Sequence, residues 1–417
     1  MCIRSGSTVA SIRRSVRMQH GPRRPPDRHS HHHGARVSDL GAPLAGIRVL
    51  DCSQVVAGPM CGRMLADMGA DVIKVEFPAL DRTREVLPAV AGQSLYFTHL
   101  NAGKRGVGID LTTAAGVDVL GRLAEQVDVL VENFRPGVLD RRGLGADALL
   151  ARNPRLVYCS ISGWGQDGPW ADRRSYAPLV HAEAGRIELA ARLRDAPPQQ
   201  EVHQHGDVNT ALVATSAVLA ALLQAARTGR GQHLDLALAE ALVFTDEWSS
   251  TDLHGYGRER FFDTWTHPVF TLGDGSMAAL VGNPVRGFDT WLAALGAPPQ
   301  PRPTDDAAAL AVIRAAVAEV PDYETLERLL EPYPMFVAPV RSVAQLAETE
   351  WAGARGVFEE VEPGARVVRR AYRSRQADVG VRGPAPRPGE HTRAVLAELL
   401  DLDDAAVAAL VAGGAVF

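Results

Sequence analysis

Short segments that are almost entirely apolar alternate with helical segments over residues 47–162, and this alternation restricts the fold more than any other feature of the sequence. "IRVLDCS" (47–53) precedes a segment of helical spacing, and "DVIKVE" (71–76) follows it. The order repeats with "RGVGIDL", "DVLVEN" and "LVYCSIS". Strands that are apolar on both faces and are joined through helices run parallel between two helical layers. The sequence therefore predicts a doubly wound α/β domain.

A long helix is predicted over residues 208–227, and it is apolar on nearly all sides. Its polar residues, among them Thr210, Thr215, Ser216 and Gln224, favour a buried core or interface helix over a membrane span.

The pattern changes after Gly231. A predicted hairpin over residues 267–282 and several short helices separated by prolines indicate a smaller α+β domain. We therefore expect a large domain formed by residues 44–230 and 336–417, with residues 231–335 forming the small domain and its linkers.

Positive charge is concentrated in residues 1–43, which carry eight arginines against two aspartates and therefore have a net charge of +6. This segment contains "RHSHHHGAR" and shows little apolar periodicity, so we expect a disordered Arg/His-rich extension. It lacks the apolar stretch of a secretory signal. The total charge of −5 leaves −11 for the remaining chain, which gives no general reason to expect nucleic-acid binding.

The cysteines form neither a Cys-x-x-Cys pair nor a zinc-binding spacing, and reduced thiols in a cytoplasmic protein account for them. Two histidine-rich stretches raise a metal hypothesis: His31–His33, and "EVHQHGD" (201–207), whose polar residues alternate. The first lies in the extension and the second follows "RDAPPQQ" as a predicted loop. We expect no metal site.

Several blocks together resemble the family III CoA-transferases, whose relatives include α-methylacyl-CoA racemase. They are "VLDCSQVVAGPMCGRMLADMGADVIKVE", "LNAGKRGVGIDL", "ENFRPGVLDRRGLG", "ISGWGQDGP", "ARTGRGQHLDLALAE" and "RPGEHTRAVLAEL", and the match covers about 44–417. The resemblance implies a Rossmann-like large domain built from both chain ends, a small middle domain, and a homodimer of interlocked chains. It also implies a CoA thioester and a carboxylic acid as substrates, without a tightly bound cofactor.

The resemblance also indicates which residues contact CoA. They are Val55, Val56, Ala57, Lys104, Arg105, Asn133, Phe134 and Arg141. A loop that leads into a helix N-terminus offers N–H groups to phosphate, and arginine or lysine pairs with the remaining charge. Phe77 stands where many relatives have an arginine, so one expected nucleotide contact is absent or rebuilt.

The resemblance places the transferase nucleophile, an aspartate that follows a tyrosine, at position 177, where this chain has Ala177 after Tyr176. In the racemases a His–Asp pair moves the α-proton; Tyr176 replaces that histidine, while Asp207 matches the aspartate. A methyl group cannot form the acyl anhydride, and a phenol is a poor base at neutral pH.

Three polar residues remain as catalytic candidates. His181 lies one helical turn from Ala177 and is either a neutral general base or a hydrogen-bonded core histidine. Glu183 points elsewhere on the helix and also suits a surface or interface role. Asp207 either caps the helix that begins at Val208 or takes part in catalysis.

The sequence therefore predicts a cytoplasmic, homodimeric enzyme that moves CoA between carboxylic acids. Without a carboxylate at Ala177, the acceptor's own carboxylate would attack the thioester, with the N–H groups of "GWGQDGP" stabilising the oxyanion. Three alternatives stay open: a racemase or isomerase that uses Asp207 with His181, a non-catalytic acyl-CoA-binding protein, and a subunit that needs a second chain.

Overall fold

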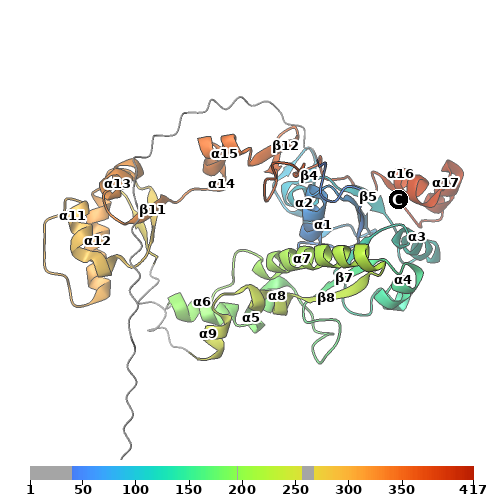
Figure 1. Cartoon of the computed structure of the whole chain (residues 1–417), viewed down its shortest axis with the longest axis horizontal. Helices are drawn as coiled ribbons and strands as arrows, with labels where there is room; N and C mark the ends of the chain where they lie inside the picture. Colours follow the sequence, from blue (N-terminus) through green and yellow to red (C-terminus); the bar gives the residue numbers. More distant parts are fainter. Residues whose placement is uncertain (1–39, 195, 256–266) are drawn as a thin grey trace, which may run out of the picture. The chain divides into compact units, whose positions relative to one another are not determined.

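The computed structural model describes residues 40–194, 196–255 and 267–417, and its centre is a six-stranded parallel sheet (Figure 1). The predicted parallel α/β architecture is confirmed. The predicted extension lies outside the described residues up to residue 39. The strands are β1 (Arg48–Asp51), β2 (Asp71–Glu76), β5 (Arg105–Gly108), β6 (Val129–Glu132), β7 (Val157–Ser162) and β8 (Gln232–Ala237).

The strand order is β5-β2-β1-β6-β7-β8. The chain builds outward from β1 in one direction through β2 and β5, and then returns to place β6, β7 and β8 on the other side. In such sheets, ligands bind beyond the carboxyl ends of the strands where the order reverses. Here that point lies between β1 and β6.

Adjacent strand residues point to opposite faces and enter two separate cores. Leu50 and Tyr158 face one helical layer, whereas Val49 and Val157 face the other. The first layer consists of α3 (Ala114–Ala124), α4 (Ala146–Arg152), α16 (Thr392–Leu400) and α17 (Asp404–Ala412). The second consists of α1 (Ala57–Asp67), α5 (Ala177–Glu183), α7 (His205–Thr228) and α8 (Leu238–Thr245).

Residues from near both ends of the described chain contribute to the first core. Val395 and Leu396 of α16 pack with strand residues from the beginning of the sheet, and Val416 forms a β-bridge with Ile109. Residues near the carboxyl end are therefore required to bury one face of the sheet.

Helix α7 packs along β7 and α1 (Figure 1). Its length and hydropathy would also suit a membrane span, the one such case in the described ranges. Ala211, Ala214 and Val218 are buried in the second core, while Leu212 and Leu223 on its outer side are exposed.

A second, antiparallel sheet has its own core around Phe270, Trp291 and Ile313. It consists of β9 (Val269–Thr271), β10 (Met277–Val281) and β11 (Phe336–Pro339), with η3 (Pro284–Gly287), α11 (Phe288–Ala294), α12 (Asp306–Ala318) and α13 (Tyr323–Leu330). The expected boundaries at 230 and 335 shift, because β8 pairs with β7 and β11 pairs with β10.

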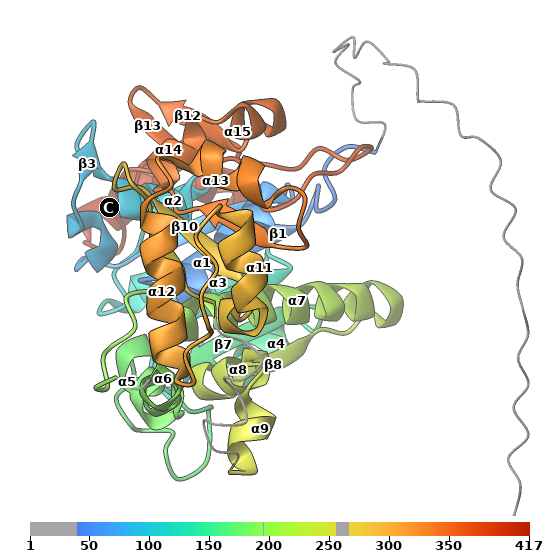
Figure 2. The same cartoon turned by 90° about the vertical axis from the view of Figure 1, so that its left-hand side faces the viewer.

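Shorter elements complete the described chain. They are η1 (Arg82–Glu85), β3 (Ala89–Val90), β4 (Gln93–Ser94), α2 (Leu95–Asn101), η2 (Asp140–Arg142), α6 (Arg186–Arg194), α9 (Ser249–Leu253), α14 (Val343–Ala347), α15 (Glu350–Arg355), β12 (Phe358–Glu362) and β13 (Ala365–Val368). Figure 2 shows α5 and α6 beside α8 and α9, as Figure 1 does, and β12 and β13 beside α14 and α15.

Candidate active site

The loop after β1 is tied to the end of β6, on the other side of the point where the strand order reverses. The Gln54 N–H donates to Asn133 Oδ1 at 2.8 Å, and Asn133 Nδ2 donates to the Gln54 carbonyl at 2.7 Å. Val55 then takes a φ of +69°, which is rare for a β-branched residue. Its N–H donates to the buried Asp81 carboxylate. The loop is therefore held from both sides before α1 begins at Ala57.

A cavity of about 390 Å³ opens at these strand ends. Its lining comes from the first loop, the loop after β6, the end of β7 with the residues that lead into α5, the first turn of α7, and the start of α8. They include Gln54, Val55, Ala57, Asn133, Phe134, Arg135, Ser162, Gly163, Arg173, Arg174, Tyr176 and Asp207.

The lining is rich in cations. Arg135, Arg173 and Arg174 contribute guanidinium groups, and α1 begins at the cavity without a side-chain cap. Arg173 also stacks on the Trp170 ring at 4.4 Å. A helix N-terminus and several arginines together suit a ligand that carries phosphate groups. None of these three arginines was among the predicted contacts, although Arg135 lies in "ENFRPG" beside Asn133 and Phe134, and Arg173 and Arg174 form the run "DRRSY".

Asp207 is the one carboxylate among the described residues that line this cavity. Burial raises the pKa of its carboxyl group from 3.8 to about 6. The residue lies in the first turn of α7, which begins at His205 and not at the expected Val208. The cap position is Gln204, so Asp207 is not the N-cap that was considered for it.

Ala177 is fully buried and does not line the cavity. It opens α5 and packs against the first turn of α7, since a Cβ placed on Gly206 would lie 3.4 Å from the Ala177 Cβ. Tyr176, one residue earlier, does line the cavity. The cavity therefore contains a carboxylate although position 177 does not supply it.

His181 is buried, and it too is absent from the cavity lining. Its Nε2 accepts a hydrogen bond from the Gly206 N–H at 2.9 Å, so this nitrogen is not available as a general base. Glu183 is also outside the lining and pairs with Arg173 at 2.5 Å. Of the three candidate catalytic residues, the structure places Asp207 alone in the cavity.

Four of the expected CoA contacts meet in this cavity: Val55, Ala57, Asn133 and Phe134. Val56 is buried at the cap of α1, and Arg141 lies in η2 outside the lining. Phe77 contacts the Phe134 ring edge-on, with centroids 5.5 Å apart. An aromatic pair thus occupies the place where a cation was expected.

Lys104 and Arg105 are engaged elsewhere. The Lys104 ammonium is buried, and its three N–H groups donate to Asp51, the Pro59 carbonyl and Asn101. Burial lowers its pKa to about 8, against the opposing effect of Asp51. Arg105 begins β5 at the amino end of the sheet and pairs with Asp71 and Glu398. Neither cation faces the cavity. Lys104 belongs to a buried ion pair, and Arg105 lies at the amino ends of the strands, opposite the cavity.

Two N–H groups of the loop "GWGQDGP" (163–169) donate to side chains of β7 and β8. The Gly165 N–H donates to Ser162 Oγ at 3.0 Å, and the Gln166 N–H donates to the Asp235 carboxylate at 3.0 Å. These two groups therefore do not form the oxyanion site that was expected of this loop.

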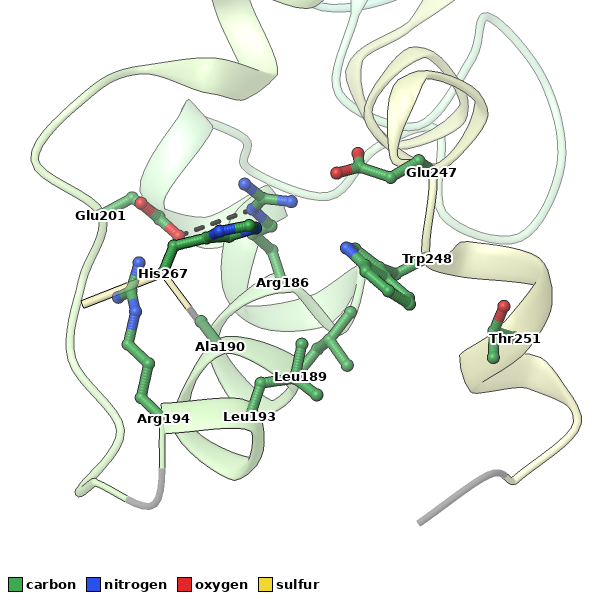
Figure 3. A pocket seen from close by; sticks show the side chains of 10 residues that line it. All are labelled: Arg186, Leu189, Ala190, Leu193, Arg194, Glu201, Glu247, Trp248, Thr251 and His267. Atoms are coloured by element: carbon green, nitrogen blue, oxygen red, sulfur yellow. Dashed lines mark ion pairs between the residues drawn. The ribbon is translucent and has the colours of Figure 1, made fainter. Parts of the chain in front are cut away.

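A larger cavity of about 840 Å³ lies over α6 and the segment between α8 and α9 (Figure 3). Its acidic residues include Glu201, which pairs with Arg186 at 3.5 Å. None of its lining residues belongs to the loops that follow β1, β6 and β7 at the carboxyl ends of these strands. The smaller cavity is the better candidate for the active site, because those loops form it and the Asp207 carboxylate lines it.

The three cysteines of the described chain form no disulfide. Cys52, Cys61 and Cys159 are free and buried, and burial raises the pKa of Cys61 to about 12.

The histidine-rich stretch "EVHQHGD" raised a metal hypothesis. Its last three residues form the start of α7, so its alternating side chains do not share one strand face. Among the described residues no cluster of three histidine, cysteine or acidic ligands occurs.

Comparison with known proteins identifies the family of this chain. The profile of CoA-transferase family III matches residues 44–392. The succinate–glutarate CoA-transferase of Agrobacterium fabrum is 33% identical over 386 residues, which cover 86% of this chain and 96% of that protein. The succinyl-CoA–L-malate CoA-transferase β subunit of Chloroflexus aurantiacus is 31% identical, covering 87% and 95%. The crystal structure of a CAIB/BAIF family protein from Brucella suis superposes with a TM-score of 0.77 at 31% identity, covering 86% and 99%.

Proposed function

Since this chain belongs to CoA-transferase family III, we propose that its strand-end cavity binds a CoA thioester and that Asp207 is the group through which CoA passes from one carboxylic acid to another. The observation that carries the proposal is the position of Asp207. It is the one carboxylate among the described lining residues, and its pKa of about 6 leaves it ionised at neutral pH.

The reaction begins when an Asp207 carboxylate oxygen attacks the thioester carbon, and the C–S bond breaks to release CoA thiolate. This step forms an anhydride between Asp207 and the acyl group. The thiolate attacks the aspartyl carbonyl, which releases the first acid and leaves CoA as a thioester on Asp207. The acceptor carboxylate then repeats the sequence in reverse, so that the new acyl-CoA departs and the Asp207 carboxylate is regenerated.

The surrounding residues have supporting roles in this proposal. Arg135, Arg173 and Arg174 pair with phosphates of CoA, and the first turn of α1 offers its N–H groups to the same charge. The Phe134 ring forms an apolar part of the cavity lining, and the Phe77 ring packs against it. The cavity fixes the thioester against Asp207, and such positioning lowers the barrier by several kcal/mol, about 7 in favourable cases.

This assignment replaces the hypothesis of direct attack by the acceptor acid. That hypothesis depended on the absence of a nucleophile at Ala177. Because Ala177 is buried and does not line the cavity, and a carboxylate is present at Asp207, the absence at position 177 does not require an unusual mechanism.

A racemase or isomerase is the second candidate, because the same carboxylate could remove a proton α to the thioester. It would need a second base across the substrate. His181 Nε2 is occupied by Gly206, and the other acid–base group of the described lining is the Tyr176 phenol. Incubation with acyl-CoA in deuterated water separates the two functions, since racemisation introduces α-deuterium and CoA transfer does not.

Substitution Asp207→Asn tests the proposal. It keeps the size of the side chain but removes the nucleophile, so CoA transfer should fall by at least about 10³-fold while CoA binding persists. Undiminished transfer by this variant would overturn the proposal. Binding without turnover by the unaltered chain, on any acceptor, would indicate an acyl-CoA-binding protein, and activity that requires a second chain would indicate a partner subunit.

We further propose a cytoplasmic homodimer. Free buried thiols support the compartment, and exposed apolar side chains such as Leu223 and Phe244 support a partner chain.

A further inference from the structure

The first turn of α7 has no capping side chain of its own. Its cap residue is Gln204, whose side chain makes no capping hydrogen bond. The first N–H groups of a helix need partners from outside the helix. One partner comes from α5, where His181 Nε2 accepts the Gly206 N–H at 2.9 Å. A neighbouring helix thus supplies the cap.

Gly206 packs closely against α5. A Cβ placed there would lie 3.4 Å from His181 Nε2 and 3.4 Å from the Ala177 Cβ, so α5 lies directly against this backbone. The Gly206 carbonyl accepts the Thr210 hydroxyl at 2.6 Å. His181 therefore fixes the peptide before Gly206, and Thr210 fixes the peptide that joins Gly206 to Asp207; neither residue lines the cavity.

The hydrogen bond also fixes the state of the imidazole. Since Nε2 accepts, the proton of the neutral ring is on Nδ1. Burial lowers the pKa of His181; Glu201 opposes the shift, and His205 and Arg186 add to it. A neutral ring keeps Nε2 as an acceptor, whereas an imidazolium would present a donor to the Gly206 N–H.

We propose that His181 is a positioning residue, which caps α7 from α5 and thereby holds the Asp207 carboxylate in line with the thioester carbon. The inference rests on the proposed role of Asp207 as nucleophile. It assigns His181 to the orientation of the nucleophile and not to proton transfer, because the residue does not line the cavity.

The test compares His181→Leu, which removes the acceptor, with His181→Gln, whose amide oxygen can accept the same N–H. The measured quantities are the dissociation constant of an acyl-CoA and the single-turnover rate of CoA transfer. We expect the leucine variant to lose at least tenfold in rate with affinity unchanged within twofold. The glutamine variant should recover most of that rate. His181→Phe, which also has no acceptor, serves if the leucine variant does not fold.

Val180→Ala is the matched control. Val180 is fully buried on the same helix, so its truncation destabilises the protein without removing the Gly206 hydrogen bond. Equal rate losses in Val180→Ala and His181→Leu, at comparable melting temperatures, would overturn the inference, as would a leucine variant with full activity.

Asp207→Asn belongs in the same series. If it abolishes transfer while His181→Leu remains fully active, the positioning role fails and the proposed function stands. If Asp207→Asn transfers CoA normally, the proposed function fails and the positioning role fails with it.

Discussion

Asp207 has a carboxyl group that is harder to ionise than an ordinary aspartate, because burial disfavours its charge. Its pKa rises from 3.8 to about 6, which is a difference of about 3 kcal/mol between its two protonation states. In the folded chain the proton binds more strongly than in the unfolded chain. Stability therefore decreases as the pH rises from about 4 to about 6, and the full cost applies above that range.

Asp207→Asn should accordingly stabilise the protein. At pH 7.5 we expect its free energy of unfolding to exceed that of the parent by about 1–3 kcal/mol, and at pH 4 the difference should vanish. Urea unfolding at the two pH values measures this. A variant that is less stable than the parent at pH 7.5 would show that the carboxylate is not desolvated in this way.

Lys104 illustrates a residue whose role depends on its surroundings and not on its motif. The stretch "N-x-x-K-R" suggested a contact with CoA, but the ammonium forms a buried pair with Asp51 at 2.7 Å. Removal of one member of such a pair leaves an uncompensated charge in the core.

We therefore expect Lys104→Met to lower the free energy of unfolding by about 3–5 kcal/mol. The double variant Asp51→Asn/Lys104→Met should recover part of the loss, because neither charge then remains unpaired. Denaturant unfolding of the parent, the single variant and the double variant measures these free energies. A Lys104→Met protein of normal stability that binds CoA weakly would instead return Lys104 to the ligand site.

At the level of elements, the loop after β1 and the loop after β6 act as one unit because Asn133 joins them through two hydrogen bonds. Their sequence suggested ligand contacts for Asn133 and for Arg141, eight residues further along. The structure gives the two residues different surroundings: Asn133 links two loops, and Arg141 lies in η2 outside the cavity lining.

Asn133→Ala should lower the free energy of unfolding by about 1–3 kcal/mol, since the partly buried N–H and carbonyl of Gln54 lose their partner, and it should also weaken CoA binding. Arg141→Ala, the control, should leave stability unchanged within about 0.5 kcal/mol. Thermal melts with and without CoA give both quantities. Normal stability of Asn133→Ala would contradict the linking role.

Helices and strands could be predicted from the sequence where burial alone decided the residue pattern. The strands between Arg48 and Ser162 are short and apolar, so burial on two faces fixed both their type and their parallel order. β8 was not predicted, because Gln232–Ala237 is an edge strand that alternates polar and apolar residues. The first loop, Asn133 and Phe134 were identified through the family resemblance, and their positions at the strand ends agree with where such sheets bind ligands.

The rest of the site could not be predicted, since it depends on contacts between distant segments. Whether position 177 or position 207 faces the cavity is decided by the packing of α5 on α7, which sequence spacing does not reveal. The buried partners of Lys104 and the cap from His181 are contacts of the same kind.

For the whole molecule, the predicted homodimer remains to be tested. Phe244 and Leu253 are 85% and 84% exposed, and Leu223 is 60% exposed, so α7, α8 and α9 each present a large apolar side chain to solvent. A partner chain that covers α7, α8 and α9 would bury them.

Light scattering should therefore give about 89 kDa, which is twice the 44.7 kDa of one chain. Phe244→Glu should shift the equilibrium toward the monomer by placing a charge in the contact, whereas Glu240→Gln on the same helix should not. A monomeric parent protein, or an unaffected Phe244→Glu dimer, would exclude these helices as the interface.

The identity of the group that receives CoA is the central question, and the most direct measurement is mass spectrometry of the protein quenched with acid during turnover of an acyl-CoA. After digestion, the peptide that contains Asp207 should have an acyl or CoA adduct, and hydroxylamine should convert Asp207 to a hydroxamate. The Asp207→Asn protein should show neither product. Steady CoA transfer without an adduct on Asp207, or an adduct on another residue, would contradict the account.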